Sequence, residues 1–159
     1  MNTTAVYVKM ALQAWQTQTS RAGELIDKLS DEQLLNEIAP GKNSGVYLVG
    51  HLIAVHDAMN GILGVGQREH TSLDEVFLKN PDRSGLEFPE TATLRRYWKE
   101  VHQKLNAALE QLAPEDWFKR HNTMTDEDFE KDPARNKLSV LLNRTNHAAY
   151  HLGQLRLLK

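Results

Sequence analysis

The segment "NSGVYLVGHLIAVHDAMNGIL", residues 43–63, carries the pattern that decides the fold class of this chain. Its apolar residues recur every three or four positions, which is the spacing of one face of an α-helix. These residues are Leu48, Leu52, Val55, Met59, Ile62 and Leu63. Asn43 or Ser44 can cap the helix, since both side chains can accept a hydrogen bond from an early backbone amide. The segment therefore predicts an amphipathic helix that ends near Leu63.

Three further segments, residues 5–29, 91–112 and 137–158, show the same helical periodicity. No segment has the strict alternation of apolar and polar residues that indicates a β-strand. Four long helices suit a four-helix bundle, and a chain of 159 residues is most simply one domain. The sequence therefore predicts an all-α fold, a single four-helix-bundle domain over residues 1–159.

The longest connection, residues 64–89, joins the second and third of these helices. It is polar, is broken by Pro81, Gly85 and Pro89, and contains a short helical pattern near residues 72–78. A connection of this length can return to the end of the bundle at which the second helix began. Helices 2 and 3 would then run parallel, in an up-down-down-up bundle with a long crossover between them.

Shorter features follow the first and third helices. Ser30 and Gln33 have the spacing of a capping box, which predicts a short extra turn after the first helix. "APEDW", residues 113–117, marks a new turn after the third helix. "MTDEDFEKDPARN", residues 124–136, is interpreted as an acidic connector that leads into the fourth helix.

The composition argues against several classes of protein. The net charge is −2, and no run of like charges offers the basic face that nucleic-acid binding usually needs. No apolar stretch approaches the roughly 18 residues of a membrane span, and the first residues lack the pattern of a signal peptide. We therefore expect a cytoplasmic protein with no nucleic-acid or membrane partner. Because the chain has no cysteine, any metal must be held by nitrogen and oxygen ligands.

A pair of histidines, His147 and His151, stands one helical turn apart in the fourth helix. The two side chains point the same way, on the flank of the apolar stripe of this helix. Zinc peptidases use histidines at this spacing, but there a glutamate follows the first histidine and acts as general base. Here Ala148 takes that position. The pair can therefore bind a metal but does not have the peptidase pattern.

A third ligand can come from the second helix, where His51 and His56 lie on opposite flanks of the apolar stripe. Either could reach inward, and periodicity does not choose between them. A weak internal repeat, "LIDKLSDEQL" against "ALEQLAPEDW", places His51 and His147 at similar depth and so favours His51. Three imidazoles suit zinc, nickel, iron(II) or cobalt, and leave a coordination position open for water or substrate.

The other histidines and two aromatic residues receive structural interpretations. His70 and His121 lie in polar, loop-like stretches. His102 lies among charged and polar neighbours of the third helix and is expected to face solvent. Trp15 and Tyr47 are interpreted as packing residues. No general acid or base is identified from the sequence, so the catalytic residues are left unassigned.

Taken in order, "PGKNSGVYLVGHLIAVHDAMNGILGVG" and the later "RTNHAAYHLGQLRLL" resemble the DinB-like metalloprotein superfamily, as does the "LSDEQL" turn after the first helix. The resemblance covers essentially the whole chain. It implies a four-helix bundle that binds a divalent metal ion (Zn, Ni or Fe), with His51, His147 and His151 as ligands. It also implies a homodimer.

For function, the resemblance implies a metal-dependent enzyme, either a transferase that joins a low-molecular-weight thiol cosubstrate to an electrophile or a related hydrolase. A non-catalytic, stress-associated, metal-binding dimer is the alternative. Arg144 lies one turn before His147 and is a candidate substrate-binding residue for an anionic group of a cosubstrate. The alternative for Arg144 is an ordinary surface arginine.

Overall fold

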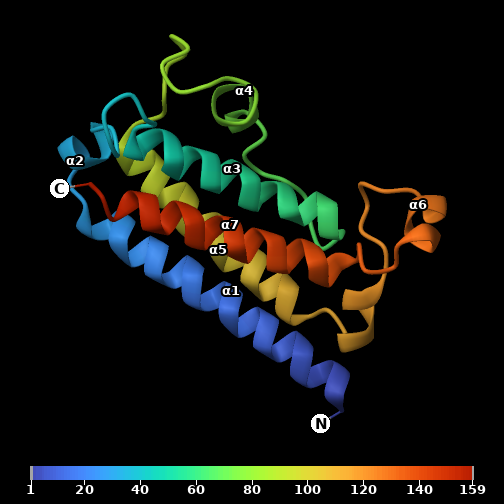
Figure 1. Cartoon of the computed structure of the whole chain (residues 1–159). Coiled ribbons are helices and arrows are strands. Elements are labelled where there is room, and N and C mark those ends of the chain that lie inside the picture. The colour runs from blue at the N-terminus through green and yellow to red at the C-terminus, as the bar shows by residue number, and fades with distance from the viewer. Residues whose placement is uncertain (1, 159) are drawn as a thin grey trace.

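The computed structural model describes residues 2–158, which are mostly helical and form no strand. The four long helices are α1 (Thr3–Lys28), α3 (Gly45–Leu63), α5 (Thr91–Glu110) and α7 (Lys137–Leu155). The short elements are α2 (Asp31–Leu35), α4 (Leu73–Phe77), the 3₁₀ turn η1 (Pro114–Phe118) and α6 (Asp126–Lys131). Figure 1 shows the four long helices packed side by side as one bundle. The prediction of an all-α fold is confirmed.

Polar caps set the starts of three long helices. Asn2, Ser44 and Asn136 are the N-caps of α1, α3 and α7, and each side chain accepts a hydrogen bond from the amide three residues further on. Of the two caps considered for α3, Ser44 is the one used. The bounds predicted from periodicity agree with those of all four long helices to within one helical turn.

The short helices also follow from their caps. The predicted capping box is present, with Ser30 and Gln33 bonding reciprocally at the start of α2. Residues 124–136, predicted as a connector, contain α6, which the periodicity did not indicate. Thr125 caps α6, and the acidic residues of its first turn interact favourably with the positive end of the helix dipole.

The buried residues gather in two clusters, and together these give the direction of each helix. One cluster joins the end of α1, the start of α3, the start of α5 and the end of α7; its members include Ile26, Leu48, Leu94 and Leu155. The other joins the opposite ends of the same helices; its members include Val8, Leu63, Leu109 and Leu141. Helices α1 and α7 therefore run one way and α3 and α5 the other, in the order up-down-down-up (Figure 1).

Hydrogen bonds attach the long crossover between α3 and α5 to residues of α3. The Asp57 carboxylate is buried and accepts hydrogen bonds from the backbone amides of Glu69 and His70 and from the Arg68 side chain. Further along, the Tyr47 hydroxyl donates to the backbone carbonyl of Asn80 at 2.8 Å. These contacts hold α4 against the start of α3, so the crossover forms a wall of the region around His51.

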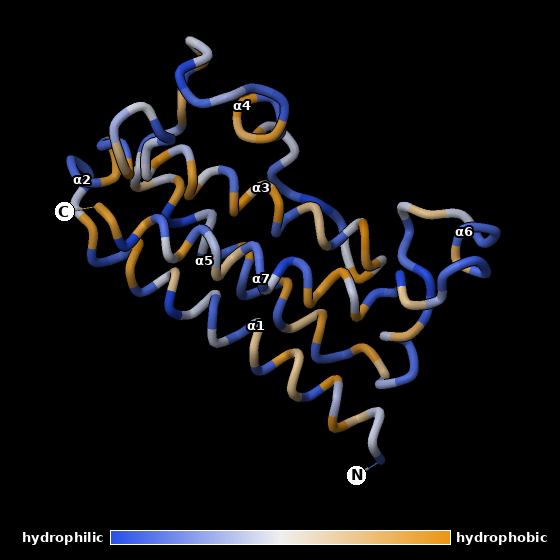
Figure 2. Tube along the Cα trace, in the orientation of Figure 1, coloured by the Kyte–Doolittle hydropathy of each residue, from blue (hydrophilic) through white to orange (hydrophobic). Residues whose placement is uncertain are grey.

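Helix α3 is the most apolar of the long helices, and orange stretches recur along it in Figure 2. Within residues 2–158 it is the one helix long and apolar enough to cross a membrane by length and composition. Most of it is buried inside the bundle, and the central helix of a folded domain passes the same test.

The prediction that His102 faces solvent is wrong, because His102 is 7% exposed. Its Nδ1 donates to the Trp98 carbonyl at 2.7 Å, so its Nε2 is left to accept a hydrogen bond from Nδ1 of His56 at 2.9 Å. The charged neighbours of His102 extend outward, while His102 follows Trp98 by one turn on the inward face. His56, the alternative third ligand, is thus paired with His102 in the interior.

Acidification is expected to weaken the fold through this buried pair. Burial lowers the pKa of His102 to about 4 and that of His56 well below its ordinary value. The unfolded chain, with histidine pKa values of about 6.5, therefore takes up protons first as the pH falls. Between pH 6.5 and 4 the free energy of unfolding should fall by on the order of 3 kcal/mol from His102 alone.

Urea unfolding of metal-free protein at several pH values between about 7 and 4 measures this loss. The double variant His56→Leu with His102→Leu is the control, and its stability should depend less steeply on pH. An unchanged slope in the double variant would show that other groups cause the acid sensitivity.

Candidate metal centre

Three histidines meet where the start of α3 faces the second half of α7. His51 projects from α3, and His147 and His151 project from α7. The Nε2 atoms of His51 and His147 are 3.2 Å apart, and those of His147 and His151 are 3.0 Å apart. One ligand atom from each residue lies within 4.8 Å of the others. The structure thus brings together the three residues that the sequence analysis selected.

Outer hydrogen bonds orient two of the three rings. Nδ1 of His51 donates to the backbone carbonyl of Phe77, at the end of α4, at 2.9 Å. Nδ1 of His151 donates to Oε1 of Gln154 at 2.6 Å. With the proton on Nδ1, each ring presents the unprotonated Nε2 to the centre, which is the arrangement of metal-binding histidines. Sequence reasoning missed both partners, although Gln154 follows His151 by one turn.

The converging nitrogens fit a cation. The Nε2 lone pairs of His51 and His151 both face Nε2 of His147. A proton on Nε2 of His147 can be donated to only one of these lone pairs at a time, whereas a divalent ion can bind all three nitrogens. Imidazole nitrogens at about 2.0–2.1 Å from a tetrahedral zinc ion lie roughly 3.3 Å from one another. The two spacings to Nε2 of His147 are close to this value, and all three ligand atoms lie within 4.8 Å of one another, as binding to one ion requires.

Burial keeps the histidines of α7 in the neutral form that binds metals. Burial, with smaller contributions from the nearby charges of His151, His51 and Arg144, lowers the pKa of His147 to about 4. Burial also lowers the pKa of His151, against the effect of its hydrogen bond to Gln154. Both side chains are therefore uncharged at neutral pH, which is the state that a metal ion binds.

Aromatic side chains pack beside the centre. The ring of Tyr47 is nearly parallel to that of His51, with 6.3 Å between the ring centroids, and it is buried as a packing residue. Tyr150 is exposed and meets His151 edge to face. The Tyr150 hydroxyl accepts a hydrogen bond from Gln154 Nε2 at 3.2 Å. Tyr150 thus steadies the residue that orients His151.

Arg144 lies one turn before His147 on α7 and is half-buried. Its Nη1 donates to the Asn143 side chain at 3.0 Å, and its Nε is buried without a partner. The nearby positive charge contributes to the low pKa of His147. Arg144 is therefore close to the histidine cluster and is more enclosed than an ordinary surface arginine.

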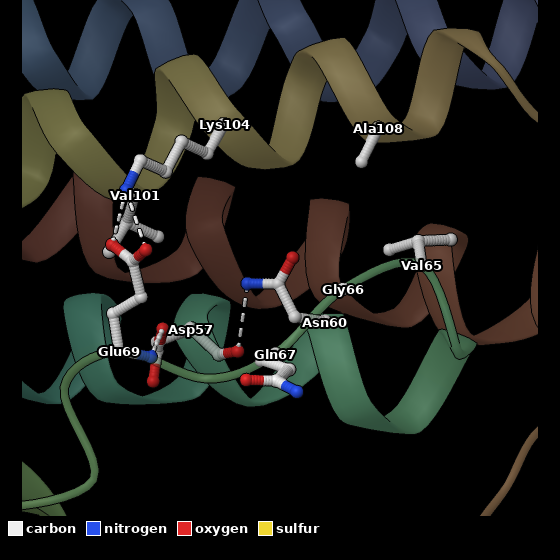
Figure 3. Close-up of a pocket in the computed structure, with 9 residues that line it drawn as sticks. All are labelled: Asp57, Asn60, Val65, Gly66, Gln67, Glu69, Val101, Lys104 and Ala108. Atoms are coloured by element: carbon white, nitrogen blue, oxygen red, sulfur yellow. Dashed lines mark hydrogen bonds and ion pairs between the residues drawn. The ribbon is translucent and has the colours of Figure 1, made fainter.

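A cavity of about 200 Å³ between α3, the crossover and α5 lies apart from the three histidines. Figure 3 shows its polar side chains bonded to one another: Lys104 reaches Glu69 at 2.7 Å, and the Asn60 amide donates to the Asp57 carbonyl at 3.1 Å. Since these polar groups are already hydrogen-bonded to one another, we do not assign this cavity to the metal centre.

The contact between Gly50 and Phe77 links core packing to the site. A Cβ atom at residue 50 would lie 2.3 Å from the Phe77 ring, which is fully buried. Gly50→Ala should therefore push α4 away, cost about 1–3 kcal/mol in unfolding free energy and displace the carbonyl that orients His51. We expect metal affinity to fall about tenfold, as when an outer partner of a ligand is lost.

Gly61→Ala on the same helix is the matched control, because a Cβ there meets no atom closer than 4.0 Å. Chemical denaturation and metal titration of the two variants measure both effects. Equal metal affinity in the two variants would show that the position of α4 does not matter to the site.

The chain matches a known family. The family model described as the DinB superfamily matches residues 14–155, a range that includes the second half of α1, all of α3 and α5, and the three clustered histidines. A comparison with curated proteins found no match.

Proposed function

The chain belongs to the DinB superfamily, and we propose that it is a metal-dependent enzyme whose ion is bound by His51, His147 and His151. The observation that carries the proposal is the convergence of three imidazole nitrogens. Two of the rings are also oriented by hydrogen bonds from their Nδ1 atoms. Three protein ligands are the number found in catalytic zinc sites, where the remaining position receives water or substrate.

The ligand set restricts the metal. Neutral imidazoles suit zinc, nickel and iron(II), and no cysteine is present to favour a thiolate site. A divalent ion held in this way lowers the pKa of a thiol or a water molecule that reaches its open position. The protein supplies the geometry: Phe77 and Gln154 hold two of the rings in the binding tautomer.

The reaction we favour is transfer of a low-molecular-weight thiol to an electrophile. The thiol loses its proton to solvent, its sulfur forms a bond to the electrophilic carbon, and the leaving group departs with its bonding electrons. The chain has no cysteine of its own, so in this reaction the thiol would arrive as a cosubstrate. Hydrolysis of an ester or amide uses the same site with water in place of the thiol.

A non-catalytic role is the second candidate, because one ligand comes from α3 and two from α7. An ion bound to all three would crosslink the two helices and stabilise the bundle without turning over a substrate.

Turnover of a panel of thiols and electrophiles tests the enzyme. Metal-loaded protein should accelerate at least one pairing, and chelation or His151→Ala should remove that acceleration. Free metal ion at the same concentration is the control. If metal raises the melting temperature but the loaded protein accelerates nothing beyond free metal, the non-catalytic role is the better description.

Homodimer formation and a cytoplasmic location stay predictions. Exposed apolar side chains on the adjacent helices α1 and α7 support the dimer; they include Tyr7, Met10, Leu142 and Tyr150. Light scattering of the purified protein measures the assembly, and cell fractionation measures the location.

A further inference from the structure

A second cavity, of about 440 Å³, lies beside the first half of α7. Among its lining residues are Arg144, Asn143 and Ser139 from α7, Arg135 just before that helix, and His121 from the loop between η1 and α6. This volume is in the range of small-molecule sites. Arg144, which lines this cavity, also lies close enough to His147 to contribute to its lowered pKa.

The cavity is positively charged although the chain as a whole is not. No aspartate or glutamate lines it, and the net charge of the chain is −2. Within residues 2–158, Arg135 and Arg144 form no ion pair. Other arginines do pair with carboxylates; these are Arg68, Arg83, Arg95, Arg96 and Arg120. The two arginines of the cavity thus lack the counter-charge that five of the nine arginines of this chain have.

Arg144 is the more informative of the two because it is half-buried. Taking a guanidinium out of water is unfavourable unless an anion or hydrogen-bond acceptors replace the water. Asn143 supplies one acceptor, while the buried Nε finds no partner in the described chain. Burial accordingly lowers the pKa of Arg144. An anion in the cavity would supply the counter-charge that this half-buried guanidinium lacks.

The loop between η1 and α6 adds a further donor. Nδ1 of His121 accepts hydrogen bonds from the Thr123 amide at 3.3 Å and from the Thr123 hydroxyl at 2.9 Å. The neutral ring therefore carries its proton on Nε2, which is a donor. The lining of the cavity thus combines two guanidinium groups with this imidazole N–H.

We propose that this cavity binds the carboxylate or phosphate group of a small organic anion, with Arg144 and Arg135 as its cationic donors. Planar guanidinium groups match both kinds of anion through paired hydrogen bonds. That the anion is part of the substrate rests on the proposed function, because Arg144 lies one turn from the ligand His147. The existence of the anion site does not depend on a metal.

Calorimetric titration of metal-free protein, kept in chelator, tests the site with three probes: succinate, inorganic phosphate and the neutral succinamide. We expect succinate or phosphate to bind and succinamide not to bind, and the stronger of the two anions identifies the group that the cavity prefers. Arg144→Gln should weaken that binding at least tenfold. Arg156→Gln is the control, because it removes the same charge from an exposed position just after the end of α7.

Thermal unfolding measured without anions shows whether each variant is still folded. Because Arg144→Gln removes an unpaired, half-buried charge, its melting temperature should equal or exceed that of the wild type. If this variant does unfold, Arg135→Gln, at an exposed position, takes its place and should weaken binding as well. The proposal is overturned if neither anion binds, or if the cavity variants and Arg156→Gln lose the same affinity. Metal content, measured separately, reports on the metal centre alone.

Discussion

His147→Ala is expected to abolish stoichiometric metal binding. His147 is the central residue of the cluster, since its Nε2 lies within 3.2 Å of the Nε2 atoms of both His51 and His151. The variant leaves two imidazoles, on two different helices, and no cysteine can replace the lost ligand. We expect the dissociation constant for zinc or nickel to rise at least 100-fold, which corresponds to about 2.7 kcal/mol.

Elemental analysis of purified protein and competition with a chelator of known affinity measure this loss. His121→Ala is the matched control, because it removes a histidine outside the cluster and should keep one equivalent of metal. Metal should also raise the melting temperature of the wild type, since an ion that binds only the folded chain stabilises it. One equivalent of metal bound to His147→Ala with wild-type affinity would contradict the proposed site.

Trp15→Ala is expected to cause the largest loss of stability of any substitution considered for this chain, about 3–5 kcal/mol. The Trp15 side chain is fully buried, and its Nε1 donates to Oδ1 of Asn106 at 2.8 Å. It also packs against the buried histidine pair, with its ring 4.7 Å from that of His56 and 6.0 Å from that of His102. Alanine would leave a cavity and would remove the hydrogen bond that Oδ1 of Asn106 accepts.

Two controls separate the contributions of Trp15. Trp15→Phe keeps much of the apolar volume but removes the hydrogen bond, so it should cost less than alanine, about 1–3 kcal/mol. Arg21→Ala on the same helix changes an exposed side chain and should leave the free energy of unfolding within about 0.5 kcal/mol of the wild type. Denaturant unfolding measures all three variants. A loss of less than about 1 kcal/mol for Trp15→Ala would show that the core closes around the missing ring.

The helices were predictable because their causes are local. The apolar spacing of residues 43–63 and the cap at Ser44 act over a few residues, so the start and end of α3 follow from the sequence. The same is true of the capping box at Ser30. Helix α6 was missed because it is short and has no buried residue, and its evidence is the Thr125 cap and its charged first turn.

The candidate site was predictable only in part. The spacing of His147 and His151 places both on one face of α7 whatever that helix packs against. The choice between His51 and His56 was different, since the two lie on opposite flanks of α3. Periodicity left it open, and the choice came from a weak repeat and from the resemblance to a family.

By itself, the sequence determined four amphipathic helices, the absence of thiolate ligands and one pair of histidines on a common face. Only the tertiary structure decided which histidines meet. His51 faces α7 because the start of α3 packs beside the end of α7, and because a carbonyl on the distant crossover holds its ring. His56 and His102 pair in the interior because α3 and α5 run side by side. These contacts join residues far apart in the chain, and no local pattern encodes them.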